Sequence, residues 1–209
     1  MLKIALTKGR LEKSTVELFE KMGLDVSAFD TKGRKLILPV GDEIEVVLAK
    51  APDVITYVEH GVCDICVVGK DTITERGGAF YEVLDLGFGK CKFALAAPKD
   101  SDFYSGYDVK RLASKYPQVT RDFFARKGMD VDIIKIEGSV ELAPLLGLVD
   151  GIVDLVETGN TLRENGLVEV EDVMQVSARL IVNVASMKLK KNEINALIDK
   201  IEALKEEVK

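Results

Sequence analysis

Short apolar runs, often rich in β-branched residues, alternate with amphipathic segments along most of this chain, and this alternation limits the fold more than any other feature. A run such as "EIEVVLAK" is typical of a buried strand, whereas apolar residues three and four positions apart are typical of a helix. The connections between the segments are short. The sequence therefore predicts an α/β fold whose strands are mostly parallel.

The individual elements follow from the same pattern. We expect strands at residues 3–6, 43–50, 64–69, 80–87, 92–98, 130–136 and 151–156, with one or two more within 171–185. We expect helices at residues 11–22, 52–59, 70–78, 108–117, 119–128, 139–147 (opened by Ser139), from 161 onward, and at 189–209. The last helix has an apolar stripe and is expected to pack on the first block of the chain.

The order of these elements suggests two lobes. Residues 1–91 together with 180–209 are expected to form lobe I, and residues 92–179 lobe II. The chain would cross between them twice, along "KFALAAPKDS" and "ARLIVNVA". Two crossings predict a central cleft, which is a common place for a ligand.

Charge and composition exclude several classes of protein. The 209 residues carry a formal net charge of −6, so a general basic surface for nucleic acid is not expected. The N-terminus does not resemble a secretion signal, and no apolar run is long enough to span a membrane. Three cysteines, an odd number, fit a reducing cytoplasm better than a disulfide framework.

Cys63 and Cys66 form a C-x-x-C pair that permits a metal or redox reading. A second such pair is missing, and the one histidine, His60, does not complete a zinc site. We expect both cysteines to be buried in the strand "VCDICVVG", and His60 to end a helix before Gly61.

The stretch "DLVETGNTL", residues 154–162, has the features of a phosphate-binding loop. It follows the apolar strand "GIVDLV", and ligands of open α/β sheets bind at the carboxyl ends of strands. Gly159 permits a close backbone approach, and the first amides of the following helix have no partner within the helix. Thr158 and Thr161 add hydroxyl donors.

Two carboxylates, Asp154 and Glu157, stand beside this loop. Because a carboxylate repels a phosphate, these acids need another partner, and neighbouring ribose hydroxyls are suitable. The pair therefore suggests that the ligand is a ribose 5-phosphate. The acids would also help to stabilise positive charge that develops at the anomeric carbon during a reaction. The alternative is that Asp154 caps a turn and "TGNT" only starts a helix.

Several spaced motifs stand out along the chain: "KGRL" (8–11), "DVITYVEHGVCDICVVGKD" (53–71), "LGFGKCKFALAAP" (86–98), "ASKYPQVTRDFF" (113–124) and "EGSVELAPLLGLVDGIVDLVETGNTL" (137–162). Together, and in this order along the chain, they resemble segments of the ATP phosphoribosyltransferase family. The chain departs from the family pattern at Lys50, where arginine is usual, at Ile55 for proline, and at Cys66 for glycine. Lysine keeps the positive charge but loses the two-pronged geometry of arginine.

The resemblance implies a two-lobed fold like that of type II periplasmic binding proteins. It implies transfer of the 5-phosphoribosyl group of phosphoribosyl pyrophosphate to N1 of ATP, which releases pyrophosphate in the first step of histidine biosynthesis. Mg²⁺ would be needed and held mainly by substrate phosphates rather than by a protein cage. The chain length matches the short form of the family. That form acts with a regulatory subunit resembling histidyl-tRNA synthetase, in a hetero-octamer, and would be a dimer when alone.

The resemblance also assigns site residues. The phosphoribosyl pyrophosphate site would comprise Glu141, Asp154, Glu157, Thr158, Gly159, Asn160, Thr161 and Leu162, and the ATP site Lys8, Gly9, Arg10, Lys50 and Asp71. Asp154, Glu157, Lys8 and Arg10 would act in catalysis. The alternatives are ordinary ones: Lys8, Arg10 and Lys50 as solvated charges, and Asp71 and Glu141 as first-turn acids of helices.

Two other functions compete with this one. A two-lobed binding or sensing module without catalysis would share the fold, and a phosphoribosyltransferase acting on a free nucleobase would share the phosphate loop. A binding module would bind another small molecule but not phosphoribosyl pyrophosphate. A comparison of ATP with free bases as acceptors distinguishes the two transferases.

Overall fold

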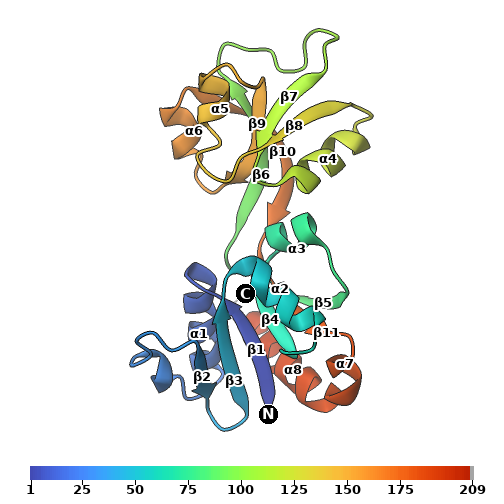
Figure 1. The fold of residues 1–209 in the computed structure, drawn as a ribbon. Helices are drawn as coiled ribbons and strands as arrows, with labels where there is room; N and C mark the ends of the chain where they lie inside the picture. The colour runs from blue at the N-terminus through green and yellow to red at the C-terminus, as the bar shows by residue number, and fades with distance from the viewer. Residues whose placement is uncertain (208–209) are drawn as a thin grey trace. The chain divides into compact units, whose positions relative to one another are not determined.

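The computed structural model describes residues 1–207, which fold as two compact units. Unit 1 comprises Met1–Gly89 and Ser177–Lys209, and unit 2 comprises Lys90–Val176. The chain leaves unit 1 once and returns to it once (Figure 1). The sequence predicts residues 92–179 for the second part, where the structure has Lys90–Val176. Within the described residues, no helix is both long and apolar enough for a membrane crossing.

Unit 1 is built on a six-stranded sheet of order β2-β3-β1-β4-β11-β5. Its strands are β1 (Leu2–Thr7), β2 (Ile37–Val40), β3 (Ile44–Ala49), β4 (Ile65–Gly69), β5 (Phe80–Asp85) and β11 (Ala178–Asn183). Its helices are α1 (Arg10–Lys21), the 3₁₀ turn η1 (Ser27–Phe29), α2 (Ala51–Glu59), α3 (Lys70–Arg76), α7 (Ser186–Leu189) and α8 (Lys191–Glu207).

The two faces of this sheet bury different apolar clusters because strand residues alternate in direction. On one face Ile4 and Leu6 of β1 pack with Phe19 of α1 and Ile194 of α8. On the other face Ala5 packs with the apolar residues of α2. The closing helix therefore does pack on the first block of the chain, as the sequence predicts (Figure 1).

Unit 2 is built on a five-stranded sheet of order β10-β6-β9-β7-β8. Its strands are β6 (Cys91–Pro98), β7 (Lys110–Ser114), β8 (Val131–Lys135), β9 (Gly151–Val156) and β10 (Leu167–Val176). Its helices are α4 (Pro117–Arg126), α5 (Leu142–Leu145) and α6 (Asn160–Glu164). Phenylalanines of α4 fill one face of the sheet, and Ala143 and Leu162, from α5 and α6, fill the other.

Three expectations about the elements are wrong. Residues 108–117 are not a helix, because Lys110–Ser114 form β7 between β8 and β9, where strand pairing outweighs the helix propensity of "KRLAS". Ser139 does not cap α5, which begins at Leu142 with Glu141 in the capping position. The strands are not mostly parallel, since β2, β5, β6, β10 and β11 pair antiparallel with their neighbours.

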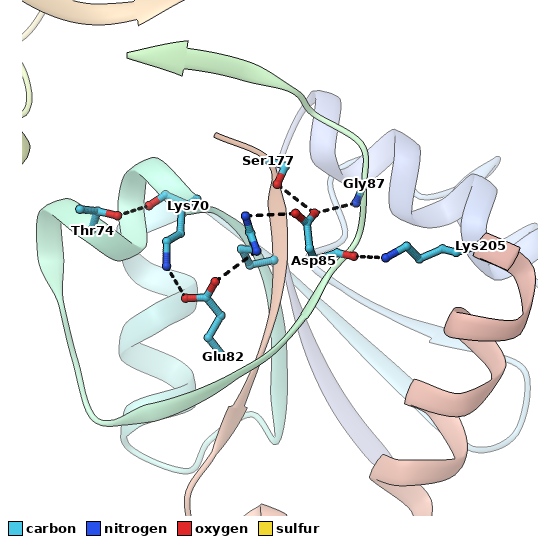
Figure 2. A network of polar contacts seen from close by, with 8 residues as sticks. Lys70, Thr74, Glu82, Asp85, Gly87, Ser177 and Lys205 are labelled. Carbon is cyan, nitrogen blue, oxygen red and sulfur yellow. Dashed lines mark hydrogen bonds and ion pairs between the residues drawn. The ribbon is translucent and has the colours of Figure 1, made fainter. Parts of the chain in front are cut away.

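A polar network fixes the point where the chain returns to unit 1 (Figure 2). The Asp85 carboxylate accepts hydrogen bonds from the Ser177 hydroxyl and the Gly87 amide, both at 2.9 Å. Arg179 pairs with Asp85 at 3.1 Å, and Lys70 pairs with Glu82 at 2.6 Å. The returning segment is thereby attached to β5 at the edge of the sheet.

Candidate functional site

A pocket of about 260 Å³ lies in unit 2 at the end of β9. It is lined by Glu141 and by the continuous stretch Asp154, Leu155, Val156, Glu157, Thr158, Gly159, Asn160, Thr161 and Leu162. Every residue that the sequence assigned to the phosphoribosyl pyrophosphate site therefore lines one pocket.

The position of β9 in the sheet directs Asp154 into this pocket. Ile152 and Val156, two residues before and after Asp154, are both buried against α5 and α6. Asp154 lies on the same face by strand alternation, and its cross-strand neighbour on β6 is the small Ala94. The carboxylate thus stands at the edge of an apolar face rather than in open solvent.

The surroundings of Asp154 disfavour the negative charge of its carboxylate. Its pKa is raised above the ordinary value, first by burial and then by the negative charge of Glu141. The Leu155 amide, which donates to Asp154 Oδ1 at 2.8 Å, and the positive charge of Lys115 act in the opposite direction. A raised pKa on a partly buried acid in a pocket is typical of functional sites.

The loop after β9 turns on Gly159, whose φ of +71° lies in the left-handed region. A Cβ at this position would lie 2.9 Å from Glu169 Oε1 and 3.2 Å from Arg163 Nη1. The Asn160 amide donates to the Thr158 hydroxyl at 3.4 Å, and the Asn160 side chain accepts from Arg163. The backbone conformation therefore favours glycine, and a side chain here would displace the ends of the Glu169 and Arg163 side chains.

Some side chains of the loop are exposed to solvent and others are buried. Glu157, Thr158, Asn160 and Thr161 are exposed, so a ligand can reach them. Leu162 is buried in the core under α6 and anchors the loop. The loop thus presents a carboxylate, two hydroxyls and the first amides of α6 from a fixed base.

The residues predicted to bind ATP lie in unit 1. Lys8, Gly9 and Arg10 follow β1, and Lys50 follows β3, which is parallel to β1 and in register with it from Leu2 to Thr7. The Lys8 amide donates to the Ala49 carbonyl at 3.0 Å, so the two strand ends lie together. Lys8, Arg10 and Lys50 are exposed at this edge.

Asp71 lies near the same edge, because β4 is also parallel to β1. It occupies the first turn of α3 and folds back over Gly69, where an added Cβ would lie 2.0 Å from Asp71 Oδ1. The carboxylate of Asp71 therefore occupies the space above the capping glycine, which accords with the helix-start alternative.

Lys115 is a charged neighbour of Asp154 that the sequence did not single out. It is the first residue after β7, the strand that the sequence mistook for part of a helix. The segment "KRLAS" before it shows no strand alternation, since its last three residues are all buried.

Cys63 and Cys66 are fully buried in the apolar cluster between the unit 1 sheet and α2, as expected. Only Cys66 lies in a strand, because β4 begins at Ile65. His60 caps the C-terminus of α2, also as expected. Among residues 1–207, no group of three or more His, Cys, Asp or Glu side chains is arranged to hold a metal ion.

Known proteins similar to this chain fall mainly into one family. The family model HisG, ATP phosphoribosyltransferase, matches residues 50–203. An ATP phosphoribosyltransferase of Clostridium kluyveri is 62% identical over 202 residues, which are 96% of this chain and 92% of that protein. One from Clostridium novyi is 56% identical, over 95% of each chain.

Solved structures agree with the family match. The ATP phosphoribosyl transferase (HisG:HisZ) complex from Thermotoga maritima contains a chain with 32% identity and a TM-score of 0.83, with 99% of this chain and 100% of that chain covered. The periplasmic aliphatic sulphonate binding protein SsuA of Escherichia coli has 12% identity and a TM-score of 0.58, over 96% and 70% of the chains, and shows the fold alone. The predicted type II binding-protein fold is therefore confirmed.

Proposed function

Since the chain belongs to the ATP phosphoribosyltransferase family, it is an enzyme of the first step of histidine biosynthesis, and we propose that the unit 2 pocket binds its sugar phosphate. The reaction transfers the 5-phosphoribosyl group of phosphoribosyl pyrophosphate to N1 of ATP and releases pyrophosphate. A binding module without catalysis is not favoured, because relatives that match nearly the whole chain carry the enzyme's name.

The proposal rests mainly on one observation: the three acids and the loop after β9 line the same pocket. Asp154 and Glu157 accept hydrogen bonds from the ribose hydroxyls, and Glu141 helps to orient the ring. The amides and hydroxyls from Thr158 to Thr161 bind the 5-phosphate, and Leu162 fixes the end of the loop.

ATP is assigned to the edge of unit 1, where Lys8, Arg10 and Lys50 gather at the ends of parallel strands. Their charges suit a triphosphate or a leaving pyrophosphate, and Gly9 lets the chain turn into α1 with a φ of +101°. Asp71 is the weakest member of this group, because it already covers Gly69.

The chemistry needs no protein nucleophile, because N1 of the adenine attacks the anomeric carbon itself. The protein positions the two substrates and stabilises charge. Asp154 and Glu157 stabilise the positive charge that develops on the ribose, and Lys8 and Arg10 stabilise the negative charge of the departing pyrophosphate.

Mg²⁺ fits this arrangement as an ion held mainly by substrate phosphates. The carboxylate oxygens of the pocket are of the kind that Mg²⁺ accepts, but residues 1–207 form no cage of three or more ligands. When bound, the ion neutralises part of the charge of the pyrophosphate.

The enzyme is assigned a regulatory partner resembling histidyl-tRNA synthetase. A protein of the same family is found in a HisG:HisZ complex, and this chain covers all of the matched chain of that structure. The proposed assembly is a hetero-octamer in the cytoplasm, with a dimer of this chain when the partner is absent.

The test is to mix the protein with ATP, phosphoribosyl pyrophosphate and Mg²⁺, with and without the cognate partner, and to follow phosphoribosyl-ATP. Adenine and other free bases in place of ATP serve as the control for substrate choice. We expect product with ATP only. No product in the presence of the partner, or faster transfer to a free base, would refute the proposal.

A further inference from the structure

The unit 2 pocket presents an electrostatic difficulty for an anionic ligand. Glu141, Asp154 and Glu157 line it, and the lining residues in the described part of the chain include no lysine or arginine. A sugar carrying a 5-phosphate and a pyrophosphate would therefore meet three carboxylates. A cation near the pocket would lessen this repulsion.

The strand register places one cation beside the acids. Strands β7 and β9 are parallel, with Leu112 opposite Gly151 and Ala113 opposite Ile152. When this register is continued, Lys115, the first residue after β7, comes level with Asp154 of β9, and neighbouring strands lie about 4.8 Å apart.

The two side chains also share a face of the sheet. Ala113 and Ile152 are buried in the same cluster, on the face covered by α5 and α6. Because side chains return to the same face every second residue, Lys115 and Asp154 follow them onto that face. The positive charge of Lys115 accordingly lowers the pKa of Asp154, against the larger effect of burial.

The backbone that carries Lys115 is well fixed. The Ser114 hydroxyl, fully buried, donates to the Val153 carbonyl at 2.6 Å and accepts from the Tyr116 amide at 2.9 Å. These bonds tie the end of β7 to β9 on one side and to the start of α4 on the other. The side chain of Lys115 itself remains exposed and can reach a ligand.

We propose that Lys115 is a cationic residue of the sugar-phosphate site, where its ammonium group offsets the acids and contacts an anionic group of phosphoribosyl pyrophosphate. This role rests on the proposed function. The competing view is an ordinary solvated lysine, whose removal would leave binding unchanged.

The experiment compares Lys115→Gln, Lys115→Arg and a matched control, Lys99→Gln. Lys99 is also an exposed lysine of unit 2, but it follows β6, which runs antiparallel to β9. It therefore lies at the opposite end of the strands from Asp154. Calorimetric titration with phosphoribosyl pyrophosphate and Mg²⁺ measures affinity, and thermal unfolding checks that each variant is folded.

We expect Lys115→Gln to weaken binding by about tenfold, the order expected for one charge-assisted contact. Lys115→Arg should stay within about threefold of the unmodified protein because it keeps the charge. The KM for phosphoribosyl pyrophosphate should rise in Lys115→Gln while the KM for ATP does not. Rescue by arginine separates a charge effect from a purely structural one.

Three results would overturn the role of Lys115: unchanged affinity in Lys115→Gln, an equal loss in Lys99→Gln, or an equal loss in Lys115→Arg. These three results can be told apart from failure of the proposed function. If the proposed function is wrong, the unmodified protein will not bind phosphoribosyl pyrophosphate at all.

Discussion

Asp154 and Glu141 line one pocket, where burial and, after it, the negative charge of Glu141 raise the pKa of Asp154. An acid whose pKa is raised by folding favours the folded state most when it is protonated. Its contribution is therefore lost as the pH rises through its folded pKa. At neutral pH, the charged Asp154 therefore lowers the free energy of unfolding, whereas a neutral side chain of the same shape would not.

Asp154→Asn should therefore raise the melting temperature at pH 7–8 while turnover falls by about a hundredfold, the order seen when one stabilising group is lost. The asparagine oxygen can still accept from the Leu155 amide. Thermal unfolding from pH 4 to 8 should show the gain in stability shrinking toward acid. Near-normal kinetics would remove the catalytic role.

Thr161→Val should weaken binding of phosphoribosyl pyrophosphate, because the exposed hydroxyl at the start of α6 is replaced by a methyl group of similar size. Loss of one hydrogen bond to a charged group corresponds to about tenfold or more in affinity. ATP affinity and the melting temperature serve as internal controls. A calorimetric titration that gives an unchanged dissociation constant would argue against the phosphate loop.

Gly159→Ala and Gly166→Ala form a matched pair, because the two glycines have φ values of +71° and +70°. Both changes should lower stability by about 1–2 kcal/mol through left-handed strain. At Gly159 the new Cβ also approaches Glu169 and Arg163, whereas at Gly166 nothing lies within 4 Å. Only Gly159→Ala should therefore weaken phosphoribosyl pyrophosphate binding. Equal affinities in the two variants would contradict this.

Much of the pocket could be predicted from the sequence because it is local in the chain. The apolar run 151–156 followed by a glycine turn specifies a strand, a loop and a helix within about a dozen residues. Its acids and hydroxyls are neighbours in sequence as well as in space. Glu141 was found through its motif rather than through periodicity.

Lys115 could not be found in this way, because its position depends on distant segments. "KRLAS" has good helix formers and forms a strand only because β8 and β9 flank it. The sheet orders have the same origin, since β11 and β10 come from late in the chain and pair antiparallel with strands formed early in each unit. Strand β2, which carries Pro39 at the edge of its sheet, also gave no clear signal.

The cysteines offer a test of the core assignment. Burial raises the pKa of Cys63 to about 11 and raises the pKa of Cys66 well above its ordinary value, so neither is a thiolate at pH 8. Of the three cysteines in the chain, only Cys91 is partly exposed. A thiol reagent at pH 8 should modify at most one thiol rapidly in the folded protein and all three in denaturant. Rapid modification of two or more would contradict the burial.

Asp64→Asn should destabilise unit 1, because this buried carboxylate joins three segments. It accepts from the Ser186 hydroxyl at 2.7 Å, from Lys190 at 2.7 Å and from the Lys3 amide at 2.9 Å. Burial alone would raise the pKa of Asp64, but these hydrogen bonds outweigh it and hold the pKa below its ordinary value. The carboxylate therefore stabilises the fold at neutral pH.

We expect a loss of about 1.5–3 kcal/mol at pH 7 in Asp64→Asn, which corresponds to a drop of about 3–12 °C in melting temperature. The stability given by a lowered pKa is present above the unfolded value and disappears as the pH falls through the folded one, so the difference from the unmodified protein should vanish in acid. Asp100→Asn, at an exposed turn, is the matched control and should change little. Equal melting temperatures for the two variants at pH 7 would show that Asp64 does not hold β1, β4 and α7 together.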